Sequence, residues 1–179
     1  MGAAHSAPTP EVDGVETLDQ LPSARTATDE DYDFKSTHNK VTLIVNVASS
    51  CGLTTKNYED FRALQDEFGE DLLILAFPCN QFLFQESRNT KSICAFAQKR
   101  GFKGTVFEKI KVNGTGTSHV FRWLKKQQNV KRVQWNFGKF LVDKSGRVRG
   151  YYTPHTRPMA FKDAIKSLLE EPASTEPRS

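Results

Sequence analysis

An apolar run that ends in a cysteine and then gives way to a helical pattern constrains the fold more than any other feature of the chain. Residues 41–47 read Val-Thr-Leu-Ile-Val-Asn-Val, which is rich in β-branched side chains and too short to cross a membrane. A short run with little polar alternation predicts a strand covered on both faces, as in a parallel sheet. Small residues then lead to Cys51, so a cysteine stands where a strand stops.

The segment after Cys51 predicts an amphipathic helix. Its inward stripe recurs at helical spacing and comprises Tyr58, Phe61, Leu64, Gln65 and Phe68. Backbone N–H groups and the helix dipole at the start of a helix stabilise an anion, which favours a reactive thiolate at Cys51. The alternative is an inert core cysteine, because free cysteines are among the most buried residue types.

The remaining elements alternate in a way that predicts an α/β fold. A second apolar run covers residues 71–77, and a helix of about a dozen residues starts from Asn89. This order calls for right-handed crossovers and a mainly parallel sheet. The second half predicts a strand over 107–112, a helix capped by Ser118, a hairpin of 134–142 with 146–152, and a last helix around 161–169. The expected arrangement is thioredoxin-like, with a central mixed sheet of about four core strands and helices on both faces.

The length of 179 residues supports one domain with flanking tails. Residues 1–31 are rich in Pro, Thr, Ala and acid and predict a flexible N-terminal tail, residues 32–171 the domain, and residues 172–179 a polar C-terminal tail. Three cysteines, an odd number, without an apolar leader at the N-terminus favour a reducing compartment. We therefore expect a cytoplasmic protein.

The net charge of +4 hides an asymmetry along the chain. Residues 1–34 hold eight acidic residues against Arg25, a charge of −7, so the remainder carries 4 − (−7) = +11. A basic body attracts anionic lipid or small acidic substrates. No nucleic-acid-binding motif occurs and no Lys/Arg run exceeds two residues, so nucleic acid is not an expected partner.

The first six residues fit the pattern for N-myristoylation, with Gly2 after the initiator Met and Ser6 four residues beyond it. No cysteine lies nearby for a second acyl chain, and no basic cluster follows. A single myristoyl group gives only marginal, reversible membrane binding. Gly2 is therefore a candidate lipidation site that predicts weak, reversible membrane association.

Three blocks of sequence resemble, in order and at compatible spacing, the signature blocks of the glutathione peroxidase family. They are Asn46-Val-Ala-Ser-Ser-Cys51-Gly52, Leu75-Ala-Phe-Pro-Cys-Asn-Gln81-Phe82 and Trp135-Asn136-Phe-Gly-Lys-Phe-Leu-Val-Asp143. The resemblance implies a thioredoxin-like fold and an antioxidant peroxidase, with Cys51 as the peroxidatic residue and Gln81, Trp135 and Asn136 completing a catalytic tetrad. It also implies no metal and no bound cofactor, with glutathione or thioredoxin as the reducing co-substrate.

The chemistry of these four residues suits reduction of hydrogen peroxide and of organic or phospholipid hydroperoxides. A thiolate attacks one oxygen while the other leaves with negative charge, so the site must stabilise an anion before and after attack. Gln81, Trp135 and Asn136 are neutral hydrogen-bond donors that suit both stages. Attack leaves Cys51 as a sulfenic acid, which must be reduced before it oxidises further.

Two routes of regeneration remain open from the sequence. In one, two small thiols such as glutathione reduce the sulfenic acid; in the other, a second protein cysteine condenses with it and a thioredoxin-type protein opens the disulfide. Relatives that use thioredoxin carry the resolving cysteine near position 97, where this chain has Ala97 and a cysteine one helical turn earlier, Cys94. Cys94 is therefore a candidate resolving residue or a core residue. Cys79 does not distinguish the two routes, because its block also occurs in relatives that do not use this cysteine.

The resemblance also bears on assembly, and a competing function stays open beside it. Between Leu124 and Trp135 the chain lacks the long insertion of tetrameric relatives. The absence of this insertion is typical of compact members that are monomers and accept bulky lipid hydroperoxides.

The alternative function is a peroxide-sensing relay, in which the disulfide formed at Cys51 passes to a partner protein. Continuous peroxide consumption would distinguish the enzyme from the relay.

Overall fold

The computed structural model describes residues 8–86 and 88–175, and its centre is a mixed five-stranded sheet. The strand order is β5-β4-β3-β6-β7, with β3 parallel to β4 and antiparallel to β6. The strands are β3 (Val41–Val47), β4 (Leu72–Pro78), β5 (Thr105–Val106), β6 (Lys139–Val142) and β7 (Val148–Tyr152). A separate two-stranded sheet pairs β1 (Ala24–Arg25) with β2 (Asp31–Tyr32).

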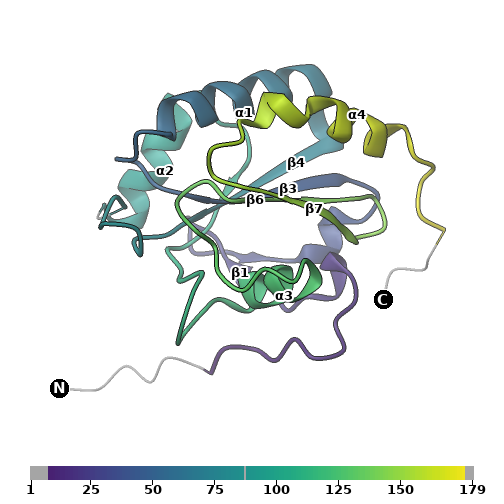
Figure 1. The fold of residues 1–179 in the computed structure, drawn as a ribbon, viewed down its shortest axis with the longest axis horizontal. Coiled ribbons are helices and arrows are strands. Elements are labelled where there is room, and N and C mark those ends of the chain that lie inside the picture. Colours follow the sequence, from purple (N-terminus) through teal and green to yellow (C-terminus); the bar gives the residue numbers. More distant parts are fainter. Residues whose placement is uncertain (1–7, 87, 176–179) are drawn as a thin grey trace.

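Helices cover both faces of the central sheet (Figure 1), which confirms the predicted thioredoxin-like α/β fold. They are α1 (Thr54–Phe68), α2 (Thr90–Lys99), α3 (His119–Gln127) and α4 (Lys162–Glu170). Short 3-10 turns accompany them: η1 (Leu18–Gln20), η2 (Phe34–Thr37), η3 (Gly69–Asp71) and η4 (Pro158–Phe161). In Figure 1, α1 and α4 lie along one face and α3 lies on the other. In the part of the chain described, no helix is long and apolar enough to cross a bilayer.

The two faces of the sheet form two separate hydrophobic cores, which explains why residues 41–47 are almost continuously apolar. Leu43 on β3 belongs to the core shared with α1, α2 and α4. Its neighbour Ile44 belongs to the core on the opposite face, where Trp123 of α3 is fully buried. Successive side chains of a strand point to opposite faces, so a central strand between two helical layers needs apolar residues at both sets of positions.

The N-terminal segment is structured, and the expectation of a flexible tail over residues 1–31 is wrong for the part described. Val12, Leu18 and Leu21 are buried against the α3 face of the sheet. The Trp123 indole N–H donates to the carbonyl of Val15 at 2.9 Å, and the Leu18 N–H donates to Gly146 O at 2.9 Å. A few apolar residues that pack against a core formed by other elements hardly change the mean polarity of their segment. Composition therefore did not predict that this segment is ordered.

Two predicted strands differ in the structure: the hairpin strand predicted over 134–142 begins only at Lys139, and the strand predicted over 107–112 does not form. The strand expected at 107–112 is replaced by β5 at Thr105–Val106, followed by single bridges at Phe107 and Ile110. Phe107 and Val112 are buried at the two ends of this irregular segment, and residues 108–111 between them are not buried, so the apolar alternation of the sequence did not produce a continuous strand. Of the predicted C-terminal tail, residues 172–175 are described, and the Ser174 N–H donates to Asn39 Oδ1 at 2.7 Å. Gly2 lies outside the described residues.

Candidate active site

The topology of the sheet brings all four predicted site residues to the same end of its central strands. Cys51 follows β3, Gln81 follows the parallel strand β4, and Trp135 and Asn136 precede β6. Because Val47 at the end of β3 pairs with Pro78, and β6 runs antiparallel to β3, these segments all meet at the carboxyl ends of β3 and β4. In open α/β sheets this edge is where ligands bind.

Cys51 occupies a tight turn between β3 and α1. Its side chain is half-buried, and the Leu53 N–H donates to its Sγ at 3.5 Å. The Cys51 N–H donates to Thr54 Oγ1 at 3.2 Å, while the Thr54 hydroxyl donates to the carbonyl of Ala48 at 2.6 Å. These hydrogen bonds fix the shape of the turn, and the sulfur faces a backbone N–H donor.

The Gln81 side chain is locked onto the backbone of a loop far along the chain. Its Oε1 accepts hydrogen bonds from the N–H groups of Val112 and Asn113, at 2.7 and 3.1 Å. Its Nε2 donates to the carbonyl of Asn113 at 2.8 Å. An amide nitrogen carries two hydrogens, so this arrangement orients Gln81 and leaves it able to donate a second bond.

Trp135 is held by Asn46, a polar residue in the apolar strand β3. Asn46 is fully buried, its Nδ2 donates to the carbonyl of Trp135 at 3.0 Å, and its Oδ1 accepts from the Gly138 N–H at 3.0 Å. The Trp135 ring packs against Phe82, with 5.5 Å between ring centroids. Sequence reasoning gave Asn46 no role, although a lone amide within a buried strand was a signal that such a group needs partners.

Asn136 is linked to the cysteine turn through Gln85. Asn136 is fully buried, and its Nδ2 donates to Gln85 Oε1 at 2.9 Å. The carbonyl of Gln85 accepts from the N–H of Ser50, next to Cys51, at 3.0 Å. Among the residues described, the Asn136 Oδ1 has no hydrogen-bond partner. The sequence also gave no reason to assign Gln85 a role, because a loop glutamine carries no local sign of a contact with a residue 51 positions away.

A buried carboxyl group lies beside this network. Glu86 is 1 % exposed, and burial raises the pKa of its carboxyl group above the ordinary value. Its backbone N–H donates to Asn80 Oδ1 at 3.0 Å. Because the raised pKa favours the neutral acid, Glu86 adds less negative charge near the cysteine turn than an exposed glutamate would.

Comparison with known proteins decides the family. The sequence model of the family described as glutathione peroxidase matches residues 21–125, more than half of the chain. The chain belongs to the glutathione peroxidase family. It is a thiol peroxidase that reduces hydroperoxides, and the relatives do not favour the alternative role of a redox relay.

Relatives of this peroxidase occur in algae, animals and plants. Glutathione peroxidase 1, mitochondrial, of Chlamydomonas reinhardtii is 44 % identical over 145 residues, covering 78 % of this chain and 72 % of its own. Glutathione peroxidase 2 of Caenorhabditis elegans is 42 % identical over 153 residues, covering 83 % and 94 %. A probable phospholipid hydroperoxide glutathione peroxidase of Citrus sinensis is 42 % identical over 154 residues, covering 83 % and 92 %.

Solved structures agree with the fold of this peroxidase. The apo crystal structure of Trgpx superposes with a TM-score of 0.73 at 30 % identity, covering 89 % of this chain and 99 % of that one. A thioredoxin-family thiol:disulfide interchange protein from Chlorobium tepidum TLS gives a TM-score of 0.64 at 13 % identity, covering 86 % and 96 %. The second likeness bears on the fold alone and confirms that it is thioredoxin-like.

The other two cysteines of the peroxidase differ from Cys51 in their surroundings. Cys79 is fully buried, and burial raises the pKa of its thiol, which opposes formation of a thiolate. Its Sγ donates to Gln81 Oε1 at 3.5 Å. Cys94 is half-buried on α2 and lines a cavity of about 420 Å³ together with Thr28 and Tyr32; none of the four predicted site residues lines that cavity.

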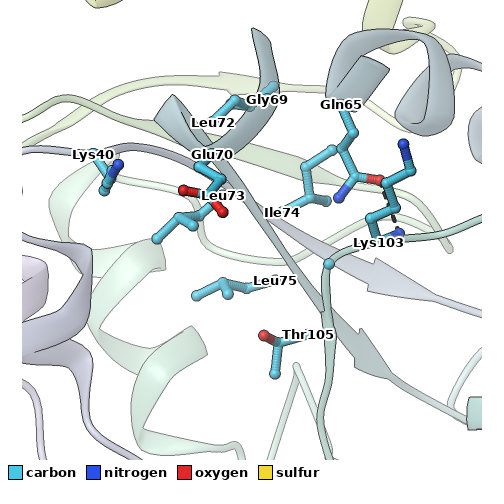
Figure 2. A pocket seen from close by; sticks show the side chains of 11 residues that line it. Lys40, Gln65, Gly69, Glu70, Leu72, Leu73, Ile74, Leu75, Lys103 and Thr105 are labelled. Atoms are coloured by element: carbon cyan, nitrogen blue, oxygen red, sulfur yellow. Dashed lines mark hydrogen bonds between the residues drawn. The ribbon is translucent and has the colours of Figure 1, made fainter. Parts of the chain in front are cut away.

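Another cavity, of about 570 Å³, lies away from the peroxidase site (Figure 2). It is lined by Lys40, which precedes β3, and by Leu72, which begins β4, so it lies at the amino ends of these strands. The Lys103 N–H closes one side by donating to Gln65 Oε1 at 3.1 Å. Within residues 8–86 and 88–175, no cluster of three or more His, Cys, Asp or Glu has the geometry to hold a metal ion.

Proposed function

We propose that Cys51 is the peroxidatic cysteine and that Gln81, Trp135 and Asn136 donate hydrogen bonds to the reacting sulfur and oxygen atoms. The observation that carries this assignment is their convergence at the carboxyl edge of β3 and β4, with a backbone N–H on Cys51 Sγ. We further propose that the substrates are hydrogen peroxide and organic hydroperoxides, including those of phospholipids. The Citrus sinensis relative, named for phospholipid hydroperoxide, supports the last of these.

The reaction balances without any group beyond these side chains and the two substrates. The Cys51 thiolate attacks one oxygen of the hydroperoxide, an S–O bond forms, and the O–O bond breaks with its electron pair on the leaving oxygen. That oxygen takes up a proton and departs as water or an alcohol, and Cys51 becomes a sulfenic acid. Fixed neutral donors stabilise negative charge on both atoms, a contribution that is often the largest in a catalytic site.

We propose that an external thiol, from glutathione or a thioredoxin-type protein, reduces this sulfenic acid directly. The thiol condenses with the sulfenic acid to give a mixed disulfide and water, and a second thiol releases Cys51. Cys94 lines a cavity apart from the four site residues, so α2 would have to unwind before Cys94 could act as the resolving residue.

The test is peroxide consumption with thioredoxin plus its reductase, and separately with glutathione plus its reductase, in the wild type and in Cys94→Ser. We expect Cys94→Ser to retain the wild-type rate to within about twofold with the preferred reductant. Loss of thioredoxin-linked turnover in Cys94→Ser alone would instead assign Cys94 as the resolving cysteine.

Trp135→Phe should slow oxidation of Cys51 by about 10- to 100-fold, because it removes an N–H donor while keeping an aromatic ring against Phe82. Stopped-flow mixing of the reduced enzyme with hydrogen peroxide measures this rate. Trp123→Phe is the matched control, since it removes an indole N–H that donates to the carbonyl of Val15 and not to the reacting atoms. The control should lose about 1 kcal/mol of stability and oxidise normally; equal oxidation rates in all three proteins would exclude the role of Trp135.

We also propose that the protein is a cytoplasmic monomer whose membrane association is reversible and is mediated by myristate on Gly2. All three cysteines are free in the described structure, which suits a reducing compartment. The intact mass of the native protein tests the modification directly, since myristoylation adds one acyl chain to Gly2 after removal of Met1.

A further inference from the structure

Two large apolar residues protrude from the loop that follows Gln81. Leu83 is 73 % exposed and Phe84 is 78 % exposed, and the next most exposed large hydrophobic residue described is Met159 at 38 %. Both loop residues have left-handed backbones, with φ of 51° and 54°. That conformation is unfavourable for side chains with a Cβ. The loop therefore presents apolar side chains to solvent and holds them there on a strained backbone, a combination that folding alone does not favour.

Positive charge lies on one side of this apolar tip, next to Phe84. Phe84 lines an open hollow of about 980 Å³, which is also lined by the side chains of Lys109, Lys111 and Arg132. None of the residues that line the hollow is an aspartate or glutamate. Gln81, from the proposed catalytic set, lines the same hollow. An apolar tip beside three cations matches the two layers of an anionic membrane surface, which are charged headgroups above acyl chains.

The N-terminal segment reaches the same hollow. Thr9 is one of the lining residues, and Pro10 is held nearby, through its carbonyl, by Arg122 of α3. Six residues lie between Gly2 and Thr9 in the sequence, and a fully extended chain of that length spans at most about 25 Å. The sequence shows no basic cluster after Gly2, but the fold collects cations from positions 109, 111 and 132 beside the point where the N-terminal segment arrives.

We propose that the apolar tip, Leu83 and Phe84, and the cationic hollow form a docking surface for an anionic lipid bilayer. Leu83 and Phe84 insert at the boundary between headgroups and acyl chains, and Lys109, Lys111 and Arg132 contact the anionic headgroups. The surface binds without acylation and strengthens, but keeps reversible, an attachment that a single myristoyl chain alone makes only marginal. Docking turns the Gln81 side of the active site toward the membrane. Only this last consequence rests on the proposed peroxidase function.

The experiment uses the full chain, expressed without myristoylation, and measures its binding to sedimented vesicles. One set of vesicles is pure phosphatidylcholine, and the other contains phosphatidylserine as a third of the lipid. We expect binding to the anionic vesicles to be at least about tenfold tighter and to weaken with added salt. Equal binding to both compositions, or none to either, would overturn the proposal.

The double variant Leu83→Gly, Phe84→Gly tests the tip without the risk of misfolding. Glycine removes the apolar side chains and also relieves the left-handed strain, so we expect a melting temperature a few degrees higher together with vesicle binding about tenfold weaker. Met159→Gly is the matched control, because it removes an exposed large apolar residue that lies elsewhere, next to Asp60. The control should bind vesicles as the wild type does; weakening of the same size in Met159→Gly would contradict the role of the tip.

Charge variants complete the test. Each of Lys109→Gln, Lys111→Gln and Arg132→Gln should weaken binding by up to about fivefold. The controls are Lys40→Gln and Lys103→Gln, which line the cavity of Figure 2 at the other end of the strands. Vesicle binding that requires the three cations but not Leu83 and Phe84 would indicate a purely electrostatic surface for an acidic partner. That result would overturn the proposed insertion of the tip into lipid.

A parallel assay with hydrogen peroxide separates this proposal from the proposed function. The tip variant should consume this small, soluble substrate within about twofold of the wild-type rate. Vesicle binding without any peroxide turnover in the wild type would refute the enzymatic assignment and leave the docking surface in place. Turnover without vesicle binding would refute the docking surface and leave the enzyme in place.

Discussion

Cys51→Ser should abolish peroxide consumption, with a loss of at least about a thousandfold in the rate. A serine hydroxyl at this position meets the same Leu53 N–H and the same Thr54 contact, yet it remains protonated and is a far weaker nucleophile. The substitution changes a single atom in a half-buried turn, so the melting temperature should stay within about 2 °C of the wild type. A coupled assay under either reductant measures the rate.

Cys79→Ser is the matched control, since it removes one thiol from the neighbouring loop. A serine hydroxyl retains a donor toward Gln81 Oε1, so the control should keep activity within a few-fold of the wild type. Peroxide consumption that survives in Cys51→Ser would refute the assignment of the whole site. If both variants lost activity equally, the loss would be explained by altered loop geometry and not by removal of the Cys51 nucleophile.

Asn46→Ala should have the largest effect on stability and should slow oxidation of Cys51 as well. The substitution removes the donor to the Trp135 carbonyl and the acceptor for the Gly138 N–H, and it leaves both groups buried without a partner. We expect a loss of about 2–4 kcal/mol of unfolding free energy. Because Trp135 loses its anchor, the rate of Cys51 oxidation should fall by about tenfold or more in the fraction that remains folded.

Thr42→Val provides the control on the same strand. Thr42 is fully buried like Asn46, but its hydroxyl has no hydrogen-bond partner among the described residues, so replacing it with a methyl group should be neutral or stabilising. Chemical denaturation measures stability, and stopped-flow mixing with hydrogen peroxide measures oxidation. An Asn46→Ala protein as stable as the wild type would show that the bridge from β3 to Trp135 contributes nothing.

Local patterns account for much of what was predicted correctly. The apolar run of β3, the helical stripe that follows it and the glycine-bearing hairpin each depend on residues a few positions apart, so the sequence reveals them directly. The positions of Cys51, Gln81, Trp135 and Asn136 at one end of the sheet follow from the strand directions, because residues after the parallel strands β3 and β4 and residues before the antiparallel strand β6 meet at the same end. Their roles remain a proposal that Cys51→Ser and Trp135→Phe test.

The sequence by itself determined the layers of the fold and the chemical types of the proposed site, because backbone periodicity and side-chain chemistry are local properties. Only the tertiary structure decided that Val12, Leu18 and Leu21 belong to the core, that Asn46 and Gln85 hold Trp135 and Asn136, and that Cys94 faces a separate cavity. It also decided that three cations from separate parts of the chain line one hollow together with the exposed Phe84. These features depend on contacts between residues far apart in the chain, and such contacts exist only once the sheet has formed.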